Sequence, residues 1–281
     1  MIFGSPHWLR LADRPRIREW RLPFGGHAPL MPWITPAVPA ALEKLLLEEG
    51  QRRKLEAGEY VYTPRMSLNL MTVVTSGVAG RAFGSMYNQS KQGMALAVAH
   101  RICGGNHTFY SGRPGNGRYF AVTDCEVITL PNASIRERME EDADFRHEVE
   151  VQLECCIQSD RIGLAANAVL PVQDRVKLYL LTWAFCYCTL EKRDGEEWVR
   201  YPLILPQTQI ARVTSASLIH VKRCFSDLRA SGDVVADGDQ HLLRATALDG
   251  VWSWLRSSEE PSSACPRPRD WRGFLVGPFG D

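Results

Sequence analysis

The sequence predicts an α+β protein with an N-terminal β domain, a long helix and a C-terminal winged helix-turn-helix. Three observations carry this prediction. Short β-forming runs separated by turn residues extend over residues 53–130, as in sandwiches and rolled barrels. A proline-free stretch rich in Glu, Arg and aliphatic residues follows over 132–167. Residues 207–232 then show helical spacing that is interrupted once by a small polar run.

The composition is that of a globular protein with about two domains. Hydrophobic residues make up 45% of the 281 residues and charged residues 23%, both ordinary fractions. The net charge is only +1, so attraction to nucleic acid has to come from local charge. No apolar run reaches the ~18 residues of a membrane span, and no secretory signal is recognised. We therefore expect a cytoplasmic protein, without a membrane partner, whose eight cysteines stay reduced.

The N-terminal part is expected to comprise an irregular arm and a β domain. Residues 1–37 are rich in Pro, Trp and Arg and predict the arm, whereas residues 38–131 predict the β domain. Residues 40–49 have the spacing of a short amphipathic helix. Strands are predicted over residues 59–63, 70–75, 95–102 and 125–130.

Residues 132–168 are predicted to form a long helix with a break near Phe145. Four apolar residues follow one another along it at spacings of 4, 4 and 3: Phe145, Val149, Leu153 and Cys156. This spacing is close to a coiled-coil seam, although the next positions, Asp160 and Gly163, are not large apolar residues. We expect the stripe to join two copies of the chain. Packing of the stripe on the chain's own β domain is the alternative.

Residues 169–255 are predicted to form a winged helix-turn-helix. A hinge at 167–171 precedes an apolar helix over 171–190, because the residue before a proline disfavours helix. The polar run 214–217 separates two further helices, and Ser217 is a suitable N-cap for the second. The Asp237-Gly238 pair predicts a hairpin directly after that helix. Residues 256–281, rich in Pro, Ser and Arg, are expected to be disordered.

The second of these two helices is basic, which favours contact with DNA. Residues 207–232 carry Arg212, Lys222, Arg223 and Arg229 against Asp227, a local excess of three positive charges. On an isolated helix such residues form a solvated face. A helix-turn-helix followed by a wing favours DNA contact instead. The residues predicted to contact DNA are Thr208, Gln209, Ser217, Leu218, Ile219, His220, Lys222 and Arg223.

In this order, the elements resemble the CRP/FNR family of bacterial transcription regulators over about residues 40–254. The matching stretches are Arg53-Lys54-Leu55 with Ala57-Gly58-Glu59, Val73 to Val78, Ala121 to Val127, and Gln209-Ile210-Ala211 with Ser217, Val221, Arg223 and Leu228. The resemblance implies a β-roll sensor domain (a double-stranded β-helix, cupin-like), a dimerisation helix and a winged helix-turn-helix. It implies a non-enzymatic homodimer that binds an inverted-repeat operator in double-stranded DNA under the control of an effector, with RNA polymerase as a further partner to be tested.

The recognition helix departs from the family pattern. The family often begins this helix with Arg-Glu and places an Arg four residues after the Glu, and these positions resemble Leu218, Ile219 and Arg223. Arg223 keeps the ability to grip a guanine edge with two hydrogen bonds. Leu218 and Ile219 cannot form hydrogen bonds through their side chains, but one could contact a thymine methyl group. We therefore expect an operator that differs from the family's common half-site.

The β domain departs from the family's nucleotide binders as well. Those members hold a cyclic nucleotide with a Gly-Glu pair and an Arg-Ser pair. In the corresponding loop, residues 103–121, Asn106 or His107 fills the acidic position and no Arg-Ser pair is present, which argues against cyclic AMP or cyclic GMP. No cysteine precedes Cys103, which argues against the N-terminal iron–sulfur cluster of oxygen-sensing members. The effector is unidentified, and its predicted contacts are Gly104, Gly105, Asn106, His107, Arg118 and Tyr119.

A haem- or thiol-based redox or gas sensor is the alternative function. His100, Cys103 and His107 lie close together in the sequence, and haem-binding relatives use the same domain. Spacings of three and four residues are weak support for a ligand set, and packed core roles are the simpler interpretation. We therefore assign no metal site and no catalytic residue from the sequence.

Overall fold

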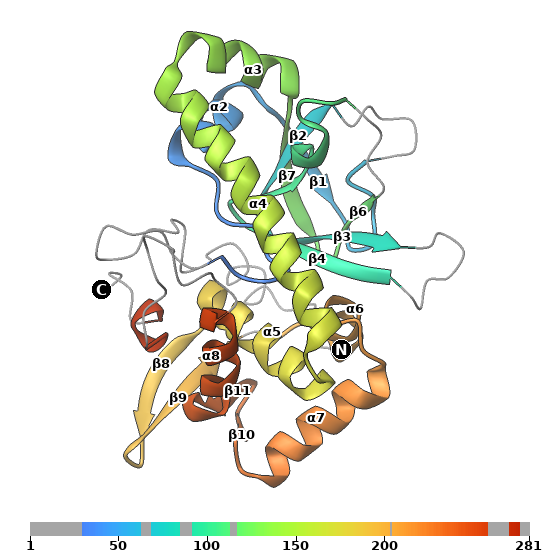
Figure 1. Ribbon diagram of the computed structural model, residues 1–281. Helices are drawn as coiled ribbons and strands as arrows, with labels where there is room; N and C mark the ends of the chain where they lie inside the picture. The colour runs from blue at the N-terminus through green and yellow to red at the C-terminus, as the bar shows by residue number, and fades with distance from the viewer. Residues whose placement is uncertain are drawn as a thin grey trace. The chain divides into compact units, whose positions relative to one another are not determined.

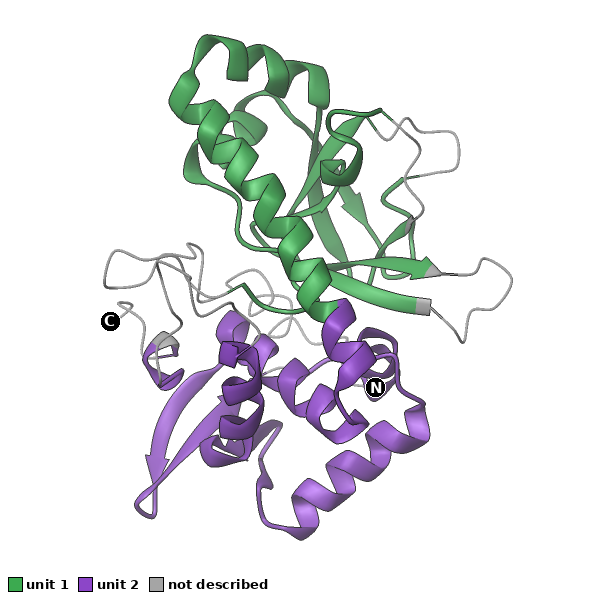
Figure 2. Cartoon of the chain, in the orientation of Figure 1, with its two compact units in different colours: residues 1–14, 30–163 green, residues 15–29, 164–281 purple. Residues whose placement is uncertain are grey.

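The computed structural model describes residues 30–62, 69–84, 92–112, 117–202, 204–257 and 270–275. They fall into two compact units, which divide between Gly163 and Leu164 (Figure 2). The dividing point lies inside one long helix, α4 (Ala143–Val169). None of the described helices combines the length and apolarity needed to cross a bilayer.

Unit 1 contains a β-roll made of two antiparallel sheets (Figure 1). The first has the strand order β1-β7-β2-β5 and the second the order β4-β3-β6. The strands are β1 (Gln51–Leu55), β2 (Leu70–Ser76), β3 (Val78–Gly84), β4 (Gln92–Val98), β5 (Arg101–Gly104), β6 (Gly117–Ala121) and β7 (Cys125–Pro131). The helix α2 (Ala40–Glu49) precedes them, with the bounds predicted from the sequence.

Two strand predictions were wrong within this unit. The predicted strand over 95–102 is divided into β4 and β5 by a turn at which His100 takes a left-handed backbone, with φ 65°. No glycine or proline marks that turn, so no local signal revealed it. The predicted strand over 59–63 reduces, among its described residues, to an isolated bridge between Tyr60 and Phe120. The strands β1, β3 and β6 were missed by the strand predictions.

The predicted long helix consists of two helices, α3 (Asn132–Glu141) and α4. The break falls at Asp142, close to the position expected. Asp142 has an extended backbone, and its Oδ1 accepts hydrogen bonds from the backbone N–H groups of Asp144 at 3.1 Å and Phe145 at 3.0 Å. Such a side chain caps the start of α4, so the chain ends one helix and begins another there.

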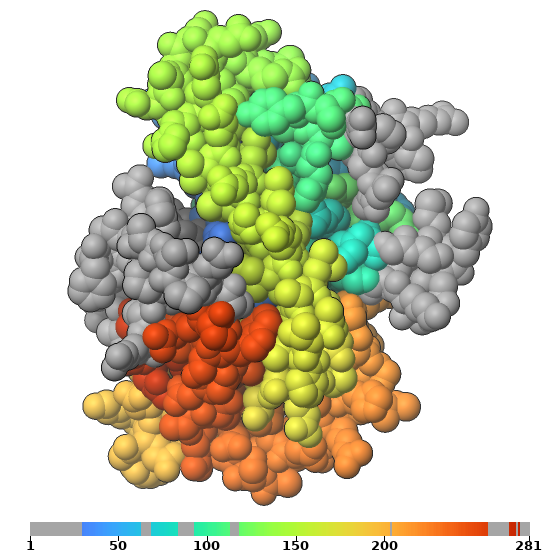
Figure 3. Space-filling view, in the orientation of Figure 1, coloured from blue at the N-terminus to red at the C-terminus, as the bar shows by residue number. Residues whose placement is uncertain are grey.

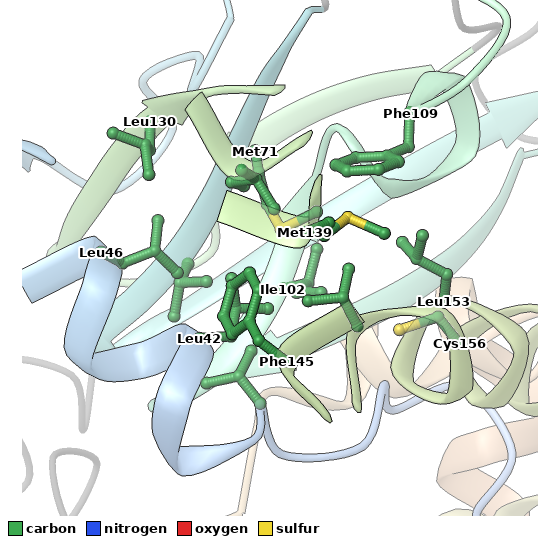
Figure 4. Packing of buried hydrophobic residues seen from close by; sticks show 14 of the residues in the cluster. Leu42, Leu46, Met71, Ile102, Phe109, Leu130, Met139, Phe145, Leu153 and Cys156 are labelled. Carbon is green, nitrogen blue, oxygen red and sulfur yellow. The ribbon is translucent and has the colours of Figure 1, made fainter. Parts of the chain in front are cut away.

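The predicted dimer seam on this helix was wrong. Phe145, Val149, Leu153 and Cys156 are each at most 6% exposed. They belong to one core cluster with Leu42 and Leu46 of α2, Met71 of β2 and Ile102 of β5 (Figure 4). Burying a large apolar side chain stabilises a fold by roughly 1.5–3 kcal/mol. The stripe therefore attaches α4 to the chain's own β-roll, and a partner cannot reach it without unfolding this core.

Unit 2 contains the winged helix-turn-helix. Its helices are α5 (Val172–Tyr187), α6 (Gln207–Val213), α7 (Leu218–Ala230) and α8 (Asp249–Ser257). Its antiparallel sheet has the order β10-β11-β9-β8, formed by β8 (Thr189–Arg193), β9 (Glu196–Tyr201), β10 (Val234–Asp237) and β11 (Gln240–Arg244). The hairpin predicted at Asp237-Gly238 is present, with Asp237 paired to Gln240. The β8–β9 hairpin was missed, although Asp194-Gly195 is the same kind of turn signal.

Part of the tail predicted to be disordered is packed on unit 2. Trp271 is 0% exposed and Leu275 2% exposed. The Trp271 indole N–H donates to Asp249 Oδ1 at 2.9 Å, and its ring lies edge-on to Phe185 at 6.4 Å between centroids. Arg272 pairs with Asp249 at 3.0 Å and with Glu197 at 2.7 Å. These partners outweigh the polar, proline-rich composition of the segment, so the prediction was wrong for residues 270–275. Residues 258–269 and 276–281 lie outside the described part.

Candidate nucleic-acid interface and effector region

The helix-turn-helix is formed by α6, the turn at residues 214–217, and α7. Ser217 caps α7 as predicted, because its Oγ accepts the backbone N–H of His220 at 3.3 Å. The buried residues of α7 are Val221, Cys224, Phe225 and Leu228. Their spacing gives α7 one apolar face, which leaves the opposite face free of core contacts.

The exposed face of α7 carries most of the residues predicted to contact DNA. Ser217, Ile219, His220, Lys222 and Arg223 are exposed, and Leu218 is half-buried. Ile219 is 77% exposed, an unusual position for a β-branched apolar side chain. Neither Lys222 nor Arg223 forms an ion pair with another described residue, so both remain available to phosphates or bases. On α6, Thr208 is exposed and Gln209 is half-buried.

Two side chains outside the motif hold the turn between its helices. Asn167, in the last turn of α4, donates through Nδ2 to the Val213 carbonyl at 3.2 Å and to Ser215 Oγ at 3.1 Å. Arg175, near the start of α5, donates through Nη1 to the Thr214 carbonyl at 2.8 Å and the Ser215 carbonyl at 3.3 Å. We call these four hydrogen bonds the turn contacts. The sequence patterns did not reveal them, because they join residues about forty positions apart.

The region predicted to bind the effector is closely packed. Gly105 has φ 90°, and a Cβ there would lie 2.2 Å from the Leu70 carbonyl oxygen, so only glycine fits. A Cβ on Gly104 would lie 2.7 Å from the Tyr62 ring, which is itself 5.1 Å from the Tyr119 ring. The adjoining cavity measures about 10 Å³, room for about one water molecule. It is lined by Thr35, Arg81, Ala95, Leu96, Ala97, Ile102, Cys103 and Asn106.

A largely buried ion pair lies beside this cavity, because Arg81 is one of the residues that line it. Arg81 Nη2 on β3 is 2.5 Å from Asp160 Oδ2 on α4, and the two side chains are 13% and 16% exposed. His107 Nε2 lies 3.3 Å from the same carboxylate oxygen. Burial and the charge of Arg81 lower the pKa of His107 to about 4, although Asp160 opposes this shift. Burial also disfavours the charge on Arg81, but Asp160 outweighs it and raises the pKa of Arg81.

Of the six predicted effector residues, only Asn106 is among the residues that line this cavity. Asn106 Nδ2 is buried without a hydrogen-bond partner among the described residues. Arg118 lies on β6 opposite Ala82, and its Nη2 is likewise buried and unpartnered in the described part of the chain. Arg81 and Asp160 were not predicted. A charged residue in an otherwise apolar strand, and an acidic residue in an apolar helical stripe, were the signals that pointed to them.

The residues of the haem alternative are not brought together. His100 Nδ1 pairs with Glu43 of α2, whereas His107 faces Asp160 of α4. The cavity beside Cys103 is far too small for a haem, and the described residues hold no cluster of three metal-ligating side chains. These side chains therefore do not fit a haem or a metal.

The buried cysteines Cys103, Cys125 and Cys156 are also poorly suited to thiol sensing. Burial raises the pKa of Cys125 to about 12 and raises those of the Cys103 and Cys156 thiols even further. A thiol that stays protonated is a weak nucleophile, because the thiolate is the reactive form.

Comparison with solved structures identifies the architecture. FixK2 from Bradyrhizobium japonicum superposes with a TM-score of 0.58 at 12% identity, covering 73% of this chain and 96% of that one. The CRP-family transcriptional regulator TTHB099 from Thermus thermophilus gives 0.54 at 16% identity, covering 72% and 96%. The chain has the CRP/FNR fold.

A third solved structure of this fold is CLP, the c-di-GMP responsive global regulator of Xanthomonas campestris. It gives a TM-score of 0.56 at 16% identity, covering 74% of this chain and all of that one, at 100%. No protein-family model and no curated protein matches the chain. At these identities the CRP/FNR fold is shared, and the function has to be inferred from the residues themselves.

Proposed function

We propose that this chain is a DNA-binding transcription regulator in which the exposed face of α7 enters the major groove. The observation that carries the proposal is the arrangement of α7 itself. It is the second helix of a helix-turn-helix, its start is capped by Ser217, and it is followed by the β10–β11 wing. Its solvent face presents Lys222 and Arg223 beside Ile219. Basic side chains on such a helix supply phosphate contacts, and a guanidinium can read a guanine edge.

Ile219 and Arg223 define the bases that the helix would read. They lie four residues apart, so they share one side of α7 and are separated by about 6 Å along its axis. Base pairs stack at about 3.4 Å, so the two side chains reach bases about two steps apart. Arg223 fits a guanine, and Ile219 fits the methyl group of a thymine. The predicted half-site therefore contains thymine and guanine about two steps apart.

The outer face of α4 is the proposed dimer surface. The side of α4 opposite the core lies on the surface in view (Figure 3). Ile157 of α4 is 48% exposed and Leu164 is 53% exposed, and their separation of seven residues puts them on one side of the helix. Apolar residues one heptad apart meet their equivalents in a parallel pair of helices. A homodimer joined there would carry two recognition helices and would bind an inverted repeat.

The β-roll is the proposed effector domain. The supporting observation is that Asn106 Nδ2 and Arg118 Nη2 are buried without hydrogen-bond partners among the described residues, because buried polar groups are normally hydrogen-bonded. The small cavity means that an effector would have to open this packing as it binds, and binding would then shift the population between two arrangements of the chain.

The experiment is selection of bound sequences from a random double-stranded DNA pool by the full-length chain, with and without cell extract. The expected product is an inverted repeat with half-site centres about one helical turn apart, each half-site holding thymine and guanine about two steps apart. Selection with Ile219→Ala should keep the guanine and lose the thymine. A pool that shows no enrichment under either condition would refute DNA recognition.

A further inference from the structure

The turn between α6 and α7 has an unusual backbone that requires support. Ser215 has φ 48°, a left-handed conformation that a non-glycine residue adopts at a cost of roughly 1–2 kcal/mol. The turn also exposes carbonyl groups at the end of α6, which lack partners within their own helix. Thr214 contributes an internal hydrogen bond from its Oγ1 to the Ile210 carbonyl at 2.8 Å.

The turn contacts supply the missing partners from outside the motif. Three successive carbonyl groups, those of Val213, Thr214 and Ser215, accept hydrogen bonds from Asn167 or Arg175. Arg175 also places a positive charge at the C-terminal end of α6, where the helix dipole favours one. Asn167 adds a bond to Ser215 Oγ, at the residue with the strained backbone.

We infer that Asn167 is a positioning residue that fixes the angle of the recognition helix relative to the end of α4. This inference rests on the proposed function. Asn167 belongs to the last turn of α4, and the turn that it holds leads directly into Ser217 and α7. Its two hydrogen bonds leave the turn little freedom to rotate against that end of α4. The last turn of α4 and the helix-turn-helix therefore move as one body.

This placement constrains the hinge expected from the sequence. Residues 167–171 contain the kink between α4 and α5, but the turn contacts bridge it from both sides. These contacts restrict bending at residues 167–171. In a dimer joined along α4, losing these bonds would loosen the spacing of the two recognition helices, because the turn would no longer be fixed to the last turn of α4.

The test compares Asn167→Ala with Gln173→Ala in the full-length chain. Gln173 Nε2 donates to Asp227 Oδ2 at 3.2 Å, so the control also removes a side-chain bond between this region and the motif, but at α7 rather than at the turn. Asn167→Asp serves as a second variant, since it keeps the side-chain shape and removes the donor. Urea unfolding and circular dichroism establish that each variant is folded.

The readouts are affinity for the selected operator, affinity for unrelated DNA, and affinity for operators with one base pair added or removed between half-sites. Asn167→Ala and Asn167→Asp should lower operator affinity about tenfold, as expected if only about a tenth of the molecules then hold the turn in its binding-competent orientation. They should leave the affinity for unrelated DNA unchanged and reduce the difference in affinity between operators of different half-site spacing. Gln173→Ala should keep that difference.

The outcomes separate the inference from the proposed function. A wild-type chain that binds no selected operator would refute the proposed function. A wild-type chain with a sharp spacing preference that Asn167→Ala and Asn167→Asp retain would overturn the inference alone. Equal loss of the preference in Gln173→Ala would overturn it as well, since the effect would then not depend on the turn.

Discussion

The ion pair between Arg81 and Asp160 should stabilise the attachment of α4 to the β-roll. The perturbation is Asp160→Leu, which leaves the Arg81 guanidinium buried without its partner. Removing one member of a buried pair costs about 3–5 kcal/mol. Both side chains retain some solvent exposure, 13% and 16%, which reduces the penalty. We therefore expect a loss of about 2–4 kcal/mol in the free energy of unfolding.

The double variant Arg81→Met with Asp160→Leu separates the pair from the packing around it. It removes both charges together, and its free energy of unfolding should lie within about 1 kcal/mol of the wild-type value, since apolar residues of similar size often replace a buried pair without loss of stability. Glu140→Leu is the control, because Glu140 is exposed on α3. It should change stability by less than about 0.5 kcal/mol.

The assay is urea unfolding at one fixed protein concentration, because dimerisation would otherwise shift the midpoint. Circular dichroism and tryptophan fluorescence together show whether the two units unfold in one step or two. If Asp160→Leu lowers the free energy of unfolding no more than Glu140→Leu does, the reasoning is refuted. A double variant as unstable as the single variant would refute it too, since the loss would then come from packing.

Three further predictions concern the His107 ring, the packed tail and the dimer face. Because the pKa of His107 is lowered to about 4 from about 6.5 in the unfolded chain, only the unfolded state takes up the proton as pH falls between these values. The free energy of unfolding should therefore fall by about 1–2 kcal/mol between about pH 7 and about pH 5, a value reduced because the 30% exposed ring is partly screened by solvent. His107→Gln should remove this part of the pH dependence in urea unfolding, and a pH profile identical to that of the wild type would contradict the prediction. Trp271→Ala should destabilise unit 2 by about 3–5 kcal/mol, since Trp271 is 0% exposed. Amide hydrogen exchange in α8 should become faster, and exchange as slow as in the wild type would contradict the prediction. Ile157→Glu with Leu164→Glu should produce monomers in sedimentation, whereas Leu47→Glu, on an exposed residue of α2, should not; a dimer that survives the first pair would exclude this face.

Local signals in the sequence were reliable where one short segment decides its own structure. Ser217 caps α7 through its own side chain, and Asp237-Gly238 closes a hairpin between adjacent strands. The helix over residues 40–49 was likewise determined by its own spacing. The order of these elements was sufficient to predict the CRP/FNR fold.

Predictions that depended on distant partners were less successful. The stripe of Phe145 and Val149 had the spacing of a dimer seam, yet the same spacing suits packing on a β-roll. Its continuation to Asp160 and Gly163 now has a physical reason. Asp160 pairs with Arg81, and a Cβ on Gly163 would lie 2.7 Å from the Trp33 ring. The polar and small residues of the stripe thus mark intrachain contacts.

The candidate site shows the same division. The residues on the exposed face of α7 follow from helical spacing, so the exposure of Lys222 and Arg223 on that surface could be predicted. Asn167 and Arg175 were missed as site residues, because nothing in their neighbourhood indicates that they bind a turn lying far along the chain. The cluster of His100, Cys103 and His107 was close in sequence only, since the turn at His100 directs its side chain to Glu43.

Operator binding by Arg223→Ala tests the central proposal most directly. Fluorescence anisotropy would compare this variant with the wild type on the selected operator and on unrelated DNA, with Arg229→Ala as the control because it is also basic and exposed on α7. We predict that Arg223→Ala weakens operator binding by about 1–3 kcal/mol and relaxes the choice of guanine at one position. Arg229→Ala should lower the affinity for the operator and for unrelated DNA by the same factor. Operator affinity and guanine preference that remain unchanged in Arg223→Ala would contradict recognition through α7.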